Sequence, residues 1–164
     1  MMKLRIGLLV IIAVLSTSVM AEMKQSNSVI IFVSFSMPRQ SLIAYLHDAN
    51  KIHASIVVLG LVNNSLKETV GTISSLVKEA GGGGVELNPL VFTTFHITKV
   101  PSVIVIPSSN TCMQQSNCSF GKDYDLIAGN ITLQAALEIV SHHGQIAAHE
   151  ANSALLILRR GEHV

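Results

Sequence analysis

The sequence predicts an α/β protein built around a mixed sheet of about four strands. Of its 164 residues, 49% are hydrophobic and only 13% are charged, the opposite of the balance in a disordered chain. Val, Ile, Leu and Ala dominate, as they do in buried strands and the helices that cover them. The order of patterns points the same way, because apolar β-branched runs alternate with amphipathic helical segments.

The chain begins with a segment that predicts export. Lys3 and Arg5 precede a short apolar run, and small residues end it at Ala21, as in a secretory signal peptide. A retained membrane anchor is the alternative, but a spanning helix needs about 20 apolar residues. We expect residues 1–21 to be cleaved after Ala21, leaving residues 22–164 as a single domain.

The next segments predict two strand–helix units. Residues 28–35 (SVIIFVSF) form a β-branched and aromatic run, typical of a strand buried on both faces. Ser36 suits a helix N-cap and Pro38 a first turn, so a helix is expected at 40–50. Residues 53–61 (HASIVVLGL) repeat the buried-strand pattern.

After a turn at 63–65, residues 66–80 predict an amphipathic helix, which the glycines at 81–84 end. Residues 85–97 predict only a helical turn. Because a helix joins the first two strands, these are expected to be parallel, with a right-handed crossover.

The remaining chain predicts two more strands and two helices. Residues 102–106 (SVIVI) and 123–128 (DYDLIA) are expected to pair as a hairpin. Residues 132–142 predict a helix with one apolar face. Residues 143–164 are expected to form a C-terminal helical tail.

Cys112 and Cys118 are the two cysteines of the chain. An exported protein meets oxidising conditions, so we expect a disulfide with a structural role in a polar loop. The alternative is a redox pair, but a reactive thiol needs a helix N-terminus or a nearby cation to stabilise its thiolate. The C-x5-C spacing also differs from C-x-x-C.

Other chemistry finds little support in the sequence, and we expect no cofactor and no metal. Eleven basic against ten acidic residues leave no excess that would neutralise nucleic-acid phosphates. His142 and His143 have no carboxylate or cysteine at ligand spacing. Asp123 and Asp125 would share one face of the fourth strand and, without an acid, base or metal partner, are interpreted as a solvated edge.

The element order, with a proline opening the third strand, resembles the thioredoxin fold. That superfamily has helices on both faces of its sheet, and a cis proline faces a C-x-x-C at the start of the first helix. Pro101 matches this proline, which implies a cis Val100–Pro101 bond. Residues 36–39 (SMPR) stand where the cysteines would be, so no catalytic dithiol is implied.

Four blocks resemble a more specific family, the TrbC proteins of F-type conjugative transfer. They are FVSFSMPRQSL at 32–42, GLVNNSLKETV at 60–70, LNPLVFTTFHITKVPSVIV at 87–105 and YDLIAGNITLQAALE at 124–138. The resemblance implies a periplasmic, non-enzymatic assembly factor of a type IV secretion system, required for pilus assembly and DNA transfer. It also implies contact with other pilus assembly proteins, among them a TraW-like periplasmic protein, without direct nucleic-acid binding or stable membrane insertion.

The chain also departs from that family. Relatives often carry Arg before the glycine of the second and fourth blocks, where this chain has Leu59 and Ala128. The family's long polar N-terminal extension is not seen, so a short form is expected. A periplasmic thiol-disulfide oxidoreductase or isomerase that uses Cys112 and Cys118 is the alternative function.

The thioredoxin-like arrangement predicts one partner-binding surface. The start of the first helix, the proline loop and the loop after the second strand would meet at the C-terminal edge of the parallel strands, where α/β sheets usually bind ligands. A flexible Met at its centre suits contact with protein. The alternative is that Met37 and Pro38 only cap the helix. The candidate residues are Ser36, Met37, Pro38, Gly60, Asn63, Asn64, Val100 and Pro101.

We expect the exported protein to begin at Glu22 and to be recovered in the periplasmic fraction of a Gram-negative host. Mass spectrometry of the N-terminal peptide after fractionation measures this. Membrane-bound protein that keeps residues 1–21 would contradict the expectation.

Overall fold

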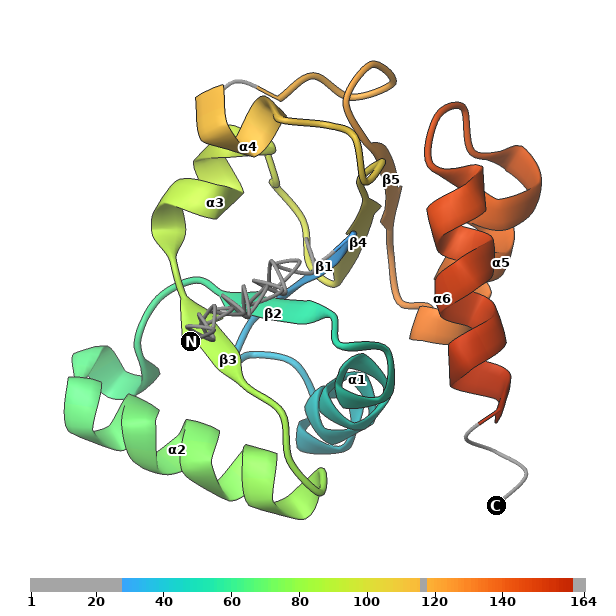
Figure 1. The fold of residues 1–164 in the computed structure, drawn as a ribbon. Coiled ribbons are helices and arrows are strands. Elements are labelled where there is room, and N and C mark those ends of the chain that lie inside the picture. The colour runs from blue at the N-terminus through green and yellow to red at the C-terminus, as the bar shows by residue number, and fades with distance from the viewer. Residues whose placement is uncertain (1–27, 116–117, 161–164) are drawn as a thin grey trace, which may run out of the picture.

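Figure 1 shows the computed structural model, which describes residues 28–115 and 118–160. The predicted signal peptide and its cleavage site lie outside these residues. The centre of the fold is a five-stranded mixed sheet in the order β3-β2-β1-β4-β5. Its strands are β1 (Val29–Val33), β2 (Ser55–Val58), β3 (Val85–Leu87), β4 (Ser102–Val105) and β5 (Asp125–Ala128). The helices are α1 (Arg39–Ile52), the short 3-10 helix η1 (Val62–Asn64), α2 (Leu66–Glu79), α3 (Pro89–Thr94), α4 (Cys112–Gln115), α5 (Leu133–His143) and α6 (Ala148–Arg160).

The central strand β1 is buried along its whole length. It pairs in parallel with β2 and antiparallel with β4. β3 extends the parallel side, and β5 pairs antiparallel with β4. This confirms the expected α/β class, the parallel first pair and the hairpin of the last two strands.

β3 is a strand that the sequence analysis missed, so the sheet has five strands rather than about four. Only three residues form it, with Val85 half-buried and the next two exposed. So short a segment shows no alternation of apolar and polar residues. Its pairing with β2, in which Leu87 lies opposite Val58, is what makes it a strand.

Helices cover both faces of the sheet, because β1 sends alternate side chains to two separate cores. Val29, Ile31 and Val33 join the larger core, which contains the buried faces of α1, α2, α5 and α6. Ile30 and Phe32 join the smaller core, with α3 and the disulfide loop. Figure 1 shows α3 and α4 together, away from the α5–α6 pair.

The start of α1 differs from the expectation, whereas the start of α2 agrees with it. Pro38, rather than Ser36, stands at the N-cap of α1, and no side chain accepts a hydrogen bond there. The Ser36 N–H instead donates to Ser34 Oγ at 3.2 Å. At α2, the side chain of Ser65 accepts the Glu68 N–H, as a helix cap should.

A buried carboxylate holds the α5–α6 pair against the sheet. Asp125, at the start of β5, is only 6% exposed. It accepts the backbone N–H groups of Gln145 (3.0 Å), Ile146 (3.1 Å) and Ala147 (2.8 Å) in the α5–α6 linker. The approach leaves no room at Gly144, where a Cβ would lie 2.8 Å from Asp125 Oδ2. The interpretation of Asp125 as part of a solvated edge was therefore wrong.

We expect Asp125→Asn to lower the free energy of unfolding by about 2–4 kcal/mol, because the amide loses the charge and its NH2 group replaces one acceptor oxygen, which turns N–H groups toward at least one of the three backbone donors. Urea unfolding of the purified protein measures this. Glu86→Gln is the control, since Glu86 is an exposed carboxylate on β3, and its effect should stay within about 0.5 kcal/mol. An unchanged unfolding midpoint for Asp125→Asn would contradict the anchoring role.

Candidate protein-interaction edge of the sheet

The register of the strands brings five loops to one edge. Val33 at the end of β1 pairs with Val58 at the end of β2. β4 runs in the opposite direction, so its first residue, Ser102, lies between Phe32 of β1 and Ala128 of β5. Leu87 at the end of β3 pairs with Val58 as well, so the loops after β1, β2, β3 and β5 and the loop before β4 leave the sheet together. We call this side the C-terminal edge.

The proline loop lies in the middle of the C-terminal edge. The Val100–Pro101 bond is cis, Pro101 is buried, and Val100 is half-buried against the smaller core. The carbonyl of Pro101 accepts the Gly129 N–H at 3.0 Å, which ties the loop before β4 to the loop after β5. Pro101 thus lies inside the edge, where a partner could not reach it directly.

The other predicted contact residues differ in exposure. Met37, the predicted centre of the surface, is half-buried and packs against the larger core. The side chain of Asn63 donates to Glu68 Oε2 at 2.8 Å, which joins the η1 turn to α2. The exposed members of the set are Ser36, Pro38, Gly60, Asn63 and Asn64.

An apolar surface that the sequence analysis did not identify lies along the same edge. Leu59 directly follows β2 and is 49% exposed. Leu87 ends β3 opposite Val58, so the register brings it close to Leu59. Other exposed leucines lie in the loop after β2 and in the first turns of α2 and α3. We call the set the leucine rim, and its members are Leu59, Leu61, Leu66, Leu87 and Leu90.

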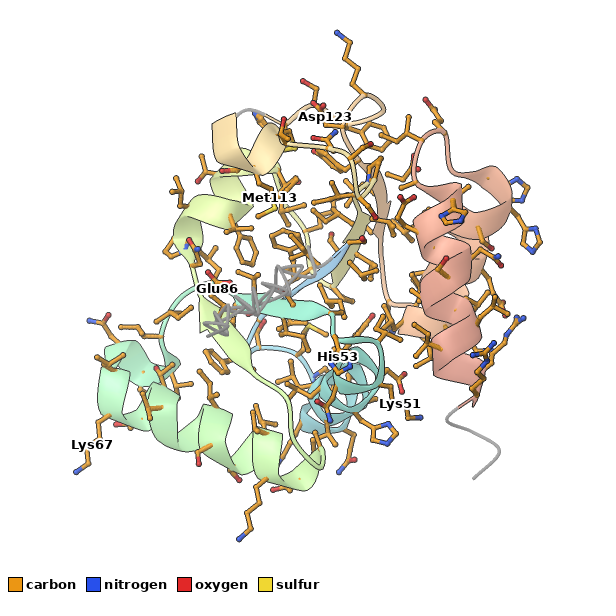
Figure 2. The ribbon with its side chains drawn as sticks, in the orientation of Figure 1. Lys51, His53, Lys67, Glu86, Met113 and Asp123 are labelled. Atoms are coloured by element: carbon orange, nitrogen blue, oxygen red, sulfur yellow. A yellow bond between two sulfur atoms is a disulfide. The ribbon has the colours of Figure 1, made fainter. Side chains whose placement is uncertain are left out.

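Two charged residues, Lys67 and Glu86, directly follow or precede members of the leucine rim in the chain. Figure 2 shows Lys67 pointing away from α2 and Glu86 on β3. An apolar surface bordered by polar groups is typical of a protein contact site. The sequence analysis missed it because residues 53–61 were interpreted as one buried strand, whereas β2 ends at Val58.

The start of α1 presents an ion pair where a dithiol enzyme would present cysteines. Arg39 pairs with Glu79 at the end of α2 and donates to Ser75 Oγ at 2.7 Å. The hydrogen bond from Arg39 lowers the pKa of the Glu79 carboxyl. Arg39 therefore joins α1 to α2, and positions 36–39 supply no thiol.

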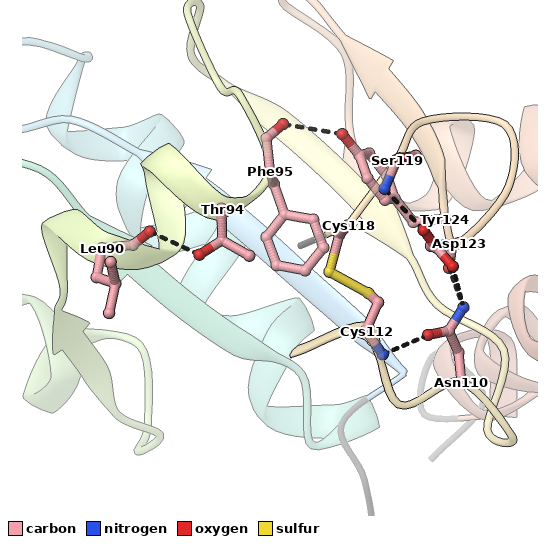
Figure 3. Close-up of a disulfide and its surroundings, with 9 residues drawn as sticks. All are labelled: Leu90, Thr94, Phe95, Asn110, Cys112, Cys118, Ser119, Asp123 and Tyr124. Atoms are coloured by element: carbon pink, nitrogen blue, oxygen red, sulfur yellow. Dashed lines mark hydrogen bonds between the residues drawn. A yellow bond between two sulfur atoms is a disulfide. The ribbon is translucent and has the colours of Figure 1, made fainter. Parts of the chain in front are cut away.

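The disulfide lies at the other end of the sheet. β4 starts beside Pro101 and has four residues, so at about 3.3 Å per residue its far end is about 13 Å away. The loop that follows contains the Cys112–Cys118 bond. The two cysteines are only 4% and 1% exposed and lie in the smaller core, beside Phe95 and Tyr124 (Figure 3). Such burial leaves an attacking thiolate little access and suits a structural bond.

Metal chemistry gains no support from the residues that the structure describes. No group of three His, Cys, Asp or Glu among them could hold a metal ion. His142 and His143 are both exposed, and their ring centroids are 6.4 Å apart. The chemistry available at the C-terminal edge is apolar contact combined with hydrogen bonding from loops.

The fold and this edge define an α/β domain suited to binding other proteins. Residues 31–140 match the family described as Type-F conjugative transfer system pilin assembly protein. The chain belongs to this TrbC family, which confirms the family predicted from the four sequence blocks.

The chain is also similar to "Periplasmic protein TrbC" of Escherichia coli (strain K12), with 34% identity over 121 residues. The alignment covers 74% of this chain and 51% of the relative, so the chain spans about half the length of the curated relative that it matches. No solved structure matches the chain. Within residues 28–115 and 118–160, no helix has the length and apolar character to cross a membrane.

We expect the wild-type protein to reduce insulin at the background rate, since its disulfide is buried and remote from Pro101. The double variant Cys112→Ser with Cys118→Ser should unfold with a free energy lower by about 2 kcal/mol, the entropy of closing so short a loop. Turbidity during insulin reduction and urea unfolding measure the two effects. Robust reductase turnover that the double variant abolishes would overturn the structural assignment.

Proposed function

We propose that this chain is a periplasmic, non-enzymatic assembly factor of an F-type conjugative type IV secretion system. It serves pilus assembly and DNA transfer through protein–protein contacts at the C-terminal edge. Membership of a pilin assembly family and the name of the periplasmic relative support this. The observation that carries the proposal is the leucine rim, a set of exposed leucines at the edge of the sheet where a dithiol enzyme would hold its cysteines.

The strand order supports a thioredoxin-like fold as part of this proposal. Without β3, the sheet is β2-β1-β4-β5, and β4 is antiparallel to both of its neighbours. Pro101, at the start of β4, follows a cis peptide bond and occupies the position of the cis proline of the thioredoxin superfamily. On this view β3, which follows α2, adds an edge strand to the sheet. The position that holds the redox site in thioredoxin-like enzymes is part of a contact surface in this chain.

The proposed partners are other pilus assembly proteins, among them a TraW-like periplasmic protein. The leucine rim would bury apolar side chains of such a partner, and the exposed Asn63 and Asn64 would supply hydrogen bonds at its border. Export by a signal peptide cleaved after Ala21 brings the chain to the same compartment.

A thiol-disulfide oxidoreductase or isomerase that uses Cys112 and Cys118 is the less supported alternative. Both cysteines are buried, and they lie at the end of the sheet away from Pro101. A substrate held beside the proline would be too distant for exchange with these sulfurs.

We expect Leu59→Asp to lower DNA transfer and pilus number by about tenfold or more, because a charge buried without a partner in an apolar contact is costly. The assay uses donor cells in which a variant replaces the native gene of the conjugative element. Leu156→Asp is the matched control, since Leu156 is 47% exposed and lies on α6, on the side of the molecule away from α2 and α3 (Figure 1). This control should transfer DNA at the wild-type frequency.

The periplasmic level and the urea midpoint of each variant show whether it folds. Normal pili after deletion of the gene would contradict the proposed function itself. Normal pili with a well-folded Leu59→Asp variant, in a strain where deletion abolishes pili, would show that the contact lies away from the leucine rim.

A further inference from the structure

Phe120 has an aromatic side chain that lies on the surface, unlike the other Phe and Tyr side chains of the described residues. It is 61% exposed. Aromatic side chains are enriched at the centres of protein interfaces, so an exposed phenyl ring on a small domain is a candidate contact. Among the described residues the other aromatic side chains are buried or half-buried: Phe32, Phe35, Tyr45, Phe92, Phe95 and Tyr124.

The turn that carries Phe120 is closed by hydrogen bonds on both sides of it. The carboxylate of Asp123 accepts the Ser119 N–H at 2.8 Å, and the Asp123 N–H donates to the Ser119 carbonyl at 2.9 Å. The Gly121 N–H donates to the Tyr124 carbonyl at 3.0 Å. Gly121 has a φ of 73°, which a residue with a side chain rarely adopts. We call residues 119–124 the aromatic turn.

Asn110 and the disulfide fix the aromatic turn to the loop before it (Figure 3). The Asn110 side chain donates to the Asp123 carbonyl at 3.0 Å and to its carboxylate at 3.1 Å. The side-chain oxygen of Asn110 accepts the Cys112 N–H at 2.6 Å. The bond from Cys112 to Cys118 then reaches the residue that precedes the turn.

The ring of Phe120 packs against the first of two buried aromatic side chains, Tyr124 and Phe95. Its centroid lies 6.0 Å from that of Tyr124, whose ring in turn meets Phe95 edge-on at 4.9 Å. The Tyr124 hydroxyl donates to the Phe95 carbonyl at 2.9 Å. Phe120 is thus supported from below and open to solvent above.

We propose that the aromatic turn is a second docking element, which inserts the Phe120 ring into an apolar pocket of another exported protein of the transfer system. The inference rests on the proposed function and extends it to a surface that the sequence analysis did not consider. A pre-organised loop loses little conformational freedom on binding, so more of the burial energy appears as affinity. The disulfide then serves to hold a docking element.

The charges of the turn indicate what kind of pocket fits it. The hydrogen bond from Ser119, followed by that from Asn110, lowers the pKa of the Asp123 carboxyl. Asp123 is therefore ionised at neutral pH and offsets the charge of the exposed Lys122 beside it. The turn carries no net charge, so the pocket needs apolar walls and no counter-charge.

Three hollows among the described residues bear on whether a second copy could receive the ring. The apolar cavity among β1, β2, α1 and α2 has a free volume of about 10 Å³. Two larger hollows, of about 190 and 260 Å³, have polar groups in their walls, such as Asp48 in the first and Asn50 in the second. None of the three is both large enough for the ring and wholly apolar, so we assign the contact to a different protein, and the crosslinking test below detects a second copy.

The aromatic turn and the leucine rim leave the sheet at opposite ends. The turn ends where β5 begins at Asp125, and β5 reaches the C-terminal edge at Ala128. One rigid sheet can therefore hold two partners at once. The chain would act as an adaptor between them.

The test compares Phe120→Ala and Phe120→Leu with the matched control Leu156→Ala, each replacing the native gene in donor cells. We expect Phe120→Ala to lower DNA transfer by about tenfold while its urea midpoint is unchanged, and Phe120→Leu to restore part of the loss because it keeps apolar area. Leu156→Ala should transfer normally. In pull-downs of the tagged chain, Phe120→Ala should lose one transfer protein, identified by mass spectrometry, that Leu59→Asp retains.

Wild-type transfer and an unchanged set of co-purified transfer proteins with Phe120→Ala, in a strain where deletion abolishes transfer, would overturn this inference and leave the proposed function intact. If deletion of the gene has no effect on DNA transfer, the proposed function is contradicted, and with it this inference, which rests on that function. Should Phe120→Ala not accumulate, a benzoylphenylalanine at position 120 keeps an aromatic ring and can be photo-crosslinked in cells. A crosslink to another protein of the conjugative element would support the inference, and crosslinks only to a second copy, or none, would overturn it.

Discussion

The pairing of β1 with β2 on one side and with β4 on the other is the constraint on which the rest of the structure depends. β1 is buried along its whole length and supplies side chains to both cores. Its parallel pairing with β2 requires a crossover, which α1 provides. Its antiparallel pairing with β4 places Pro101 at the edge where β1 and β2 end. The candidate contact surface is thus a consequence of the sheet topology.

The chemical character of this edge is the reason for proposing a contact surface there. The first residue of α1 is held in the Arg39–Glu79 ion pair, and the cysteines are buried at the far end of the sheet. The leucine rim instead offers apolar area that becomes favourable only when a partner covers it. The aromatic turn at the opposite end offers a second, pre-organised contact. In the proposed adaptor role, the sheet between them would fix the distance and direction of two partners relative to each other.

Long periodic segments made much of this fold predictable, and short or context-dependent features did not. Buried β-branched runs and amphipathic helices depend on local pattern alone, so four strands and the main helices were found. β3 exists only through its pairing with β2. The role of Asp125 depends on N–H groups from a linker far along the chain, which no local pattern reveals. At the candidate site, topology predicted that these loops meet at one edge, but the exact end of β2 decided that Leu59 is exposed, and core packing decided that Met37 is half-buried.

Hydrogen–deuterium exchange on the purified mature chain, alone and in complex with a co-purifying transfer protein, tests the central claim most directly. The account predicts slower exchange on binding in the loop after β2, in the first turn of α2 and around the start of α3, with α6 unchanged. These amides surround the leucine rim and lie on exposed loops and helix ends, where exchange in the free protein is expected to be fast. Slower exchange confined to α6, with the loops of the C-terminal edge unchanged, would contradict the account.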